Sequence, residues 1–444
     1  MPAERQRWSE VFETLKNAWK VKDIRNKIFF TLFIVLIYRL GGYIPVPYLD
    51  ATALQSMIGD SSGIFTTLNA LSGGTFSRAT LMCLSISPYI NAQIIIQLLT
   101  FAIPALERLA KEGETGREKL DKITKYTTLG IAAFQSFAYW LTLRNLGALT
   151  YVEGPAHFLS AVVIIACFTA GAMLVIWLGA QIDKRGIGNG ISMLLFAGIV
   201  ANLPTSFGAT FKLLAEMGSE QPGYIALIPI IIVIFVLMIV FIIFMDNAER
   251  RIPIQYAKRV VGRKVYGGQS TYLPIKIAMA GVLPIIFAMS FLSIPQTIQM
   301  FLKNDPQPGT FWYGFFRVFS STHPVYATIY FILIILFSYF YVSMQYNPVE
   351  IANNLRQNNG AVPGIRPGKP TSDYITRILS KLILVGALFL GVVAIFPIIF
   401  AQITKVGSIA LGGTSILIVV SVALETVRQL ESQMMLRHHK GFLE

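Results

Sequence analysis

The sequence predicts an all-α, polytopic membrane protein with ten transmembrane helices. Of the 444 residues, 54% are hydrophobic and only 14% are charged, whereas soluble domains carry about 25% charged residues. A helix that crosses a bilayer needs roughly 20 mostly apolar residues. Ten apolar segments approach or exceed that length, at about 24–44, 77–101, 124–145, 156–182, 190–211, 224–246, 273–301, 324–346, 376–403 and 408–428.

The basic residues predict how these segments are oriented. The formal net charge is +14, and the chain has 37 Lys and Arg residues. With the N-terminus inside, 30 of them fall in inside loops and tails and five in outside loops, while Arg39 and Arg78 lie at segment ends. Cytoplasmic loops are enriched in Lys and Arg. We therefore expect both termini, 1–23 and 429–444, to be cytoplasmic. The first apolar run lacks a small-residue cleavage pattern, so no removable signal peptide is expected.

The stretch Ser61–Phe101 departs from a simple series of spans. It begins with a short amphipathic segment whose apolar residues fall at helical spacing, namely Ile64, Phe65, Leu68 and Leu71. Gly73 and Gly74 are expected to end it, because glycine readily takes the left-handed conformation that closes a helix. The segment is either a half-length helix at membrane depth, buried in protein or lining a cavity, or an interfacial helix on the outer leaflet. A full-length apolar helix interrupted by Pro88 is expected to follow.

Ten segments divide into two sets of five, 24–213 and 214–428. Because five is odd, a second copy of the first set would be inverted in the membrane. Inverted repeats place the functional path at their interface, near the bilayer midplane. The halves share no convincing sequence identity, so the segment count alone makes the repeat a hypothesis.

Two cytoplasmic loops are long and basic. The first, Asp246–Pro274, alternates apolar and basic residues as a hairpin does, and its basic pairs are Arg250–Arg251, Lys258–Arg259 and Arg263–Lys264. These pairs could bind the phosphates of a nucleic acid or the headgroups of anionic lipids. The second loop, Tyr346–Ser380, is rich in Pro and Gly around Arg366, which predicts an ordered, non-helical tip.

The sequence contains no catalytic or metal-binding pattern. Its four histidines form no HExxH motif, it has no phosphate-binding loop, and the GIGNG after segment 4 lacks the preceding strand of a nucleotide site. Cys83 and Cys167 lie in apolar runs and are expected to be small buried hydrophobic residues. We therefore expect no enzymatic activity, no metal and no cofactor.

Ionisable residues lie near segment ends and none lies mid-helix, which disfavours ion-coupled transport. A passive pore gated by apolar side chains needs no such groups. An inverted-repeat secondary transporter of a small solute is the alternative function.

Several blocks of the chain are distinctive, namely GGTFSRATLMCLSISPYINAQIIIQLL, DKRGIGNGISMLLFAGIVANLP, both long cytoplasmic loops and GGTSILIVVSVALETVRQLESQMM. In sequence and order these blocks resemble the SecY family, the large subunit of the bacterial protein-conducting channel. The resemblance implies two inverted five-helix halves around an hourglass pore, sealed from outside by a re-entrant plug helix at about 61–72. It also implies a lateral gate between segments 2 and 3 on one side and segments 7 and 8 on the other.

The resemblance also implies site residues. The family constricts its pore with a ring of mostly isoleucine side chains, which by motif are Ile86, Ile90, Ile191, Leu195, Ile286 and Ile418. Polar residues near Gln135 belong to the family's lateral gate, and many relatives carry a polar residue where this chain has Ala278. The basic residues of the two long loops match regions that bind the ribosome and the motor ATPase SecA, and Arg366 matches the position most tied to coupling.

The function implied by the resemblance is the central pore of a protein translocation channel in the bacterial cytoplasmic (inner) membrane. Unfolded secretory polypeptides would cross through it, and apolar segments would leave sideways into lipid. SecE and SecG are the expected subunits. SecA, the ribosome, signal-sequence-bearing polypeptides and membrane lipid are the other expected partners, with nucleic acid met only as ribosomal RNA.

Overall fold

The computed structural model describes residues 19, 21–50, 75, 78–145, 147–150, 155–220, 224, 226–256, 259–261, 264–266, 270–299, 309–319, 323–404 and 413–440. The predicted plug, with Ile64, Phe65, Leu68 and Leu71, lies outside these residues.

In the described part of the chain, ten long helices each correspond to one predicted segment. They are α2 (Lys22–Gly41), α5 (Ser87–Ala102), α7 (Glu114–Asn145), α8 (Pro155–Arg185), α9 (Gly190–Glu220), α10 (Leu227–Asn247), α11 (Leu283–Gln299), α13 (Pro324–Gln345), α15 (Lys369–Thr404) and α16 (Gly413–Lys440). By length and composition, five described helices could each span a bilayer, and α5 with α6 (Pro104–Lys111), bent by 101°, is a sixth candidate. Two further short helices are α12 (Phe311–Val318) and α14 (Pro348–Gln357).

The second helix of each half is shorter than predicted. Residues 78–86 form consecutive turns and α5 begins only at Ser87, so the expectation of one helix interrupted by Pro88 is wrong. Pro88 lies in the first helical turn, where its missing N–H leaves no hydrogen bond unmade. Pro284 is likewise the second residue of α11, after turns at 277–282. Each half therefore begins its second helix with a proline at a break.

The two halves have the same pattern of helix neighbours. In the first half, α5 packs on α7, α7 on α8, α8 on α9, and α2 on α9. In the second half, α11 packs on α13, α13 on α15, α15 on α16, and α10 on α16. Taken in chain order, these four contacts correspond one to one, as expected for two sets of five helices with related arrangements, although α2 also packs on α8.

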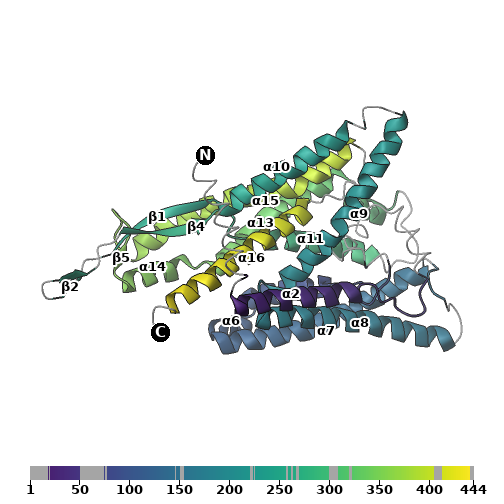
Figure 1. The fold of residues 1–444 in the computed structure, drawn as a ribbon, viewed down its shortest axis with the longest axis horizontal. Helices are drawn as coiled ribbons and strands as arrows, with labels where there is room; N and C mark the ends of the chain where they lie inside the picture. Colours follow the sequence, from purple (N-terminus) through teal and green to yellow (C-terminus); the bar gives the residue numbers. More distant parts are fainter. Residues whose placement is uncertain are drawn as a thin grey trace.

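The two halves meet through equivalent helices. The fifth helices, α9 and α16, pack against each other, and so do the second helices, α5 and α11. Figure 1 shows α2, α7 and α8 in one layer and α10, α13 and α15 in another, with α16 between them and α9 rising from the first layer to meet α10. A functional path between the halves must therefore run between these two pairs of helices.

The first of the two long basic loops forms the predicted hairpin. Strands β1 (Glu249–Tyr256) and β4 (Ser270–Lys276) pair antiparallel, and β2 (Arg259–Val261) pairs with β3 (Lys264–Tyr266). Strand β5 (Gly360–Ala361), from the second long loop, pairs with the end of β1. The hairpin extends well beyond the helices (Figure 1). The two long loops therefore form one structural unit.

Several element ends differ from the predicted boundaries. Helix α9 continues to Glu220, so the predicted division at 213/214 falls inside it. Helix α15 begins at Lys369, inside the loop predicted to end at Ser380. Cys83 is buried as expected, whereas Cys167 is only partly buried. The apolar pattern marks the membrane-facing part of each helix and misses the polar turns that extend it.

The turns at 78–86 pack very closely against α8. A Cβ atom added at Gly171 of α8 would overlap the carbonyl oxygen of Leu81. At Gly130 of α7, an added Cβ would meet nothing within 4 Å.

We predict that Gly171→Ala lowers stability by about 1–3 kcal/mol, because overpacking displaces backbone, and that Gly130→Ala does not. The measurement is the apparent melting temperature of the two purified variants in detergent. Equal melting temperatures would show that the turns do not depend on this contact.

Candidate pore and docking surface

A cavity of about 990 Å³ lies between the two halves. Much of its lining comes from α5, α9, α11 and α16, and further residues come from the ends of α8, α10, α13 and β4 and from the turn before α11. Apolar side chains line part of it, including Ile90, Ile191, Leu195, Ile286 and Ile418. Charged side chains also line it, namely Asp183, Asp246, Lys276, Glu425 and Arg428. Along α16 the lining residues pass from Ile418 to Glu425 and Arg428, so the cavity has an apolar part and a polar part.

All six predicted ring residues lie at or beside the apolar part of this cavity. Ile86 is fully buried and belongs to the apolar cluster of Leu195 and Ile418, against which Ile90 and Ile191 also pack. Ile286 lines the cavity from α11. Four helices from both halves thus bring apolar side chains to one region between the halves. An apolar lining offers nothing to replace the hydration shell of an ion.

The two predicted gate residues lie in different parts of the structure. Gln135 is on α7, which packs on α5, and its Oε1 atom is buried without a hydrogen-bond partner among the described residues. Ala278 is buried in the turn before α11 and belongs to the core of the second half. A buried, unpaired polar atom costs about 1–3 kcal/mol. The unpaired Gln135 oxygen therefore lowers the stability of the packing around this part of α7.

The predicted docking residues lie on the hairpin and beside it. Arg250 and Arg251 are exposed on β1, and Arg251 Nη2 lies 2.7 Å from Glu249 Oε1. Arg259 and Lys264 lie on the paired strands β2 and β3.

The other predicted docking residues are Lys258, Arg263 and Arg366. Lys258 and Arg263 are outside the described residues. Arg366 is exposed in the turn that follows β5, and its carbonyl oxygen accepts a 2.9 Å hydrogen bond from Thr371 Oγ1. This tip is ordered and non-helical, as predicted. The β1–β5 pairing brings the two basic loops together.

The polar part of the cavity holds residues that the sequence analysis missed. Arg428 on α16 reaches Asp246 and Asn247 at the end of α10, and the Gly188 N–H donates to Gln429 Oε1 at 2.6 Å. These partners are more than 180 residues apart in the chain, so no local spacing pairs them. The sequence of α16 did contain one indication that some of its polar residues line the cavity. The spacing of its residues places them on one helix face with the ring residue, namely Ile418, Val422, Glu425 and Gln429.

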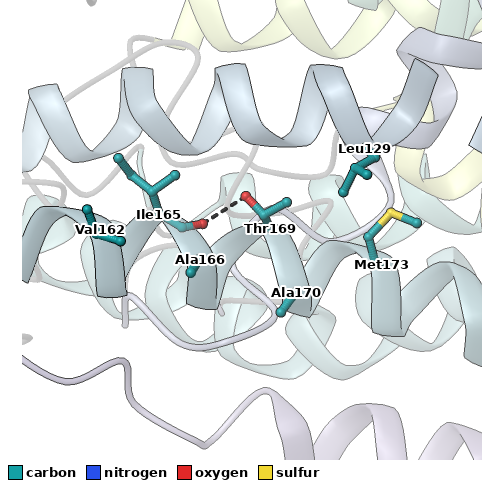
Figure 2. Close-up of a pocket in the computed structure, with 7 residues that line it drawn as sticks. All are labelled: Leu129, Val162, Ile165, Ala166, Thr169, Ala170 and Met173. Carbon is teal, nitrogen blue, oxygen red and sulfur yellow. Dashed lines mark hydrogen bonds between the residues drawn. The ribbon is translucent and has the colours of Figure 1, made fainter. Parts of the chain in front are cut away.

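A second, largely apolar groove of about 490 Å³ lies between α7 and α8 (Figure 2). Its one polar side chain, Thr169, donates to the Ile165 carbonyl oxygen at 2.8 Å, within its own helix. The groove therefore presents almost entirely apolar surface, and it shares no lining residue with the cavity between the halves.

A model of the SecY family matches residues 80–427. Protein translocase subunit SecY of Bacillus subtilis is 42% identical to this chain over 440 residues, which cover 98% of this chain and all of the relative. The chain belongs to the SecY family. The subunit of the same name from Streptomyces scabiei is 40% identical, over 96% of this chain and 98% of the relative.

Solved structures share this SecY fold. One is a protein-conducting channel, with a TM-score of 0.62 and 21% identity over 92% of each chain. Another is Sec61 in the canine ribosome–channel complex from the endoplasmic reticulum, with a TM-score of 0.60 and 20% identity over 92% of each chain. The transporter alternative receives no support from these comparisons.

The apolar lining of the cavity leads to a prediction about ion conduction. Replacing Ile86 and Ile90 with Ser should make the resting channel conduct ions, because hydroxyl groups let water and ions enter. Single-channel recording in planar bilayers is the measurement.

The matched control for this experiment is Ile95→Ser with Leu98→Ser, which changes two exposed residues of the same helix and should remain silent. Silence of both variants would contradict the assignment of the ring.

Proposed function

We propose that this SecY-family chain forms the central pore of a protein translocation channel and has no enzymatic activity of its own. The observation that carries the proposal is the cavity between the halves, which is lined in one part by apolar side chains from four helices and in another by charged side chains. The polar part keeps an unfolded polypeptide hydrated, while apolar side chains form no hydrogen bonds that would hold it. The ring residues would then close around the moving chain and limit ion leakage.

The plug is part of the same proposal. The segment of about 61–72 would seal the outer side of the constriction when no polypeptide is present. One related structure is described as showing that the plug domain of SecY stabilises the closed state and maintains the membrane seal. In this chain, Ile64, Phe65, Leu68 and Leu71 would supply the apolar face of the seal.

The contact between α5 and α11 is the proposed lateral gate, with α7 and α13 behind it. Both helices begin at a proline after a run of turns, so their ends are not continuous with a longer rigid helix. Separation of α5 from α11 would expose a polypeptide in the cavity to lipid. A segment that is apolar enough would then partition into the bilayer, and a polar segment would continue across.

The basic hairpin and Arg366 are the proposed docking surface for SecA and the ribosome, whose RNA phosphates would meet the arginines. Related channels have been solved in ribosome complexes, including canine Sec61 and yeast Ssh1. These partners would supply the energy for translocation. SecE and SecG are the proposed membrane subunits.

The chain is a multi-pass membrane protein, and we propose the bacterial cytoplasmic (inner) membrane as its location. The distribution of Lys and Arg supports cytoplasmic termini. The hairpin and Arg366 then lie on the cytoplasmic side, where SecA and the ribosome are found.

The docking proposal is tested by reversing one charge. Arg366→Glu should lower motor-driven translocation about tenfold or more, because a charge-assisted contact becomes a repulsion, while assembly is unchanged. The measurement is uptake of an unfolded precursor into vesicles that contain the purified complex.

Arg317→Glu is the control. Arg317 is also exposed, but it lies on α12, which follows the C-terminal end of α11 and precedes the N-terminal end of α13, whereas Arg366 follows the C-terminal end of α13. Unchanged uptake with Arg366→Glu would remove this residue from the docking surface.

The pore proposal itself is tested by a crosslink. A photoreactive residue at position 90 should form an adduct with a secretory polypeptide stalled halfway through export, because Ile90 lines the cavity. The same residue placed at exposed position 95 should react with lipid instead. Adducts at 95 but not at 90 would show that the polypeptide path lies elsewhere.

A further inference from the structure

Arg428 is the residue of α16 that binds the root of the docking hairpin. Its Nη2 atom lies 3.1 Å from the carbonyl oxygen of Asp246 and 2.8 Å from Asn247 Oδ1. The same nitrogen lies 2.9 Å from Asp246 Oδ2, an ion pair without hydrogen-bond alignment. Three oxygens of two consecutive residues thus surround one guanidinium nitrogen.

The three oxygens lie where α10 becomes β1. Helix α10 ends at Asn247, and β1 begins at Glu249. Between them, the Ala248 carbonyl oxygen accepts a 2.9 Å hydrogen bond from the Ile277 N–H, which closes the base of the hairpin. Asn247 is itself fixed, because its Nδ2 atom donates to the Ile243 carbonyl oxygen at 2.9 Å. Arg428 therefore binds a rigid point directly below the hairpin.

The site is partly enclosed and charged. The side chain of Asp246 is 14% exposed and that of Arg428 33% exposed, and both line the cavity between the halves. Charge-assisted hydrogen bonds are stronger in such surroundings than on an open surface. A surface ion pair of this kind would contribute little, but here one guanidinium also satisfies a carbonyl group near the end of α10.

The same helix reaches the constriction. Ile418 lies ten residues before Arg428 on α16, which is about 15 Å along a helix axis. The next residue, Gln429, accepts from the Gly188 N–H of the first half. One turn of α16 thus holds the hairpin root through Arg428 and the opposite half through Gln429.

We propose that Arg428 is a positioning residue that couples the docking hairpin to the pore helix α16. A partner that moves the hairpin would move the end of α10, and through Arg428 it would shift α16 against the first half. This inference rests on the proposed function, because it needs a partner that docks on the hairpin. Arg428 would thus transmit movement between the docking surface and the pore ring without belonging to either.

The experiment measures motor ATPase stimulation and polypeptide uptake in the same vesicle reaction, with the complete channel complex. Arg428→Ala should lower uptake about fivefold while ATPase stimulation stays within roughly twofold of the unchanged chain, as for a lost coupling contact. Arg428→Lys should be intermediate, since lysine keeps the charge but lacks the rigid fork of donors. Arg377→Ala, at an exposed cytoplasmic arginine of α15, should leave both readouts unchanged.

A second variant tests whether Arg428→Ala acts only by misfolding the protein. This control is needed because Arg428→Ala leaves the largely buried Asp246 carboxylate without its cation. The double substitution Asp246→Asn with Arg428→Gln removes both charges and should show the same loss of uptake at normal ATPase stimulation. Normal uptake with this variant and with Arg428→Ala would overturn the inference. So would a parallel fall in uptake and ATPase stimulation, which would make Arg428 part of the docking surface. If the unchanged complex took up no polypeptide, the proposed function would fail, and the inference with it.

Discussion

The structure depends on how its two halves are held together around a path. Most contacts lie within each half, and the halves are joined chiefly by two pairs of equivalent helices, α9 with α16 and α5 with α11, with a smaller contact between α9 and α10. The α9–α16 pair buries a continuous apolar cluster that includes Leu194, Leu195, Ile418 and Val422. The contact between α5 and α11 is smaller, and each of these helices begins after a run of turns. The halves are thus strongly joined on one side and weakly joined on the other, which is what a pore with a lateral opening requires.

The helices of this fold could be predicted from the sequence, because a bilayer demands long apolar segments and leaves few alternatives. The ten segments correspond to ten long helices, and the hairpin follows from its alternating pattern. The breaks before α5 and α11 could not be predicted in this way. Residues 78–86 are as apolar as a helix, and they form turns because close packing against Gly171 holds their backbone. Tertiary contacts overrode the local pattern at these breaks.

The candidate site divides in a similar way. The ring residues could be proposed only from the family resemblance, because spacing does not distinguish Ile90 or Ile418 from the many other apolar residues of their helices. The structure adds that the described ring residues share one apolar region between the halves. The polar residues of the cavity, such as Arg428 and Gln429, had no signal in the sequence as pairs. Their partners lie far along the chain, so only the folded structure brings them together.

The distribution of charge in the described helices bears on how the proposed partners would act. Charged residues are concentrated in the hairpin and at the polar part of the cavity, while a few others, such as Arg144 and Lys212, lie toward the opposite ends of α7 and α9. Under the proposed docking, force from a partner would enter at the hairpin, which extends beyond the helices (Figure 1) and whose residues Ile252 and Ile254 are buried. Because β1 begins two residues after α10 ends, a displacement of the hairpin would reach α10 with almost no intervening loop to absorb it.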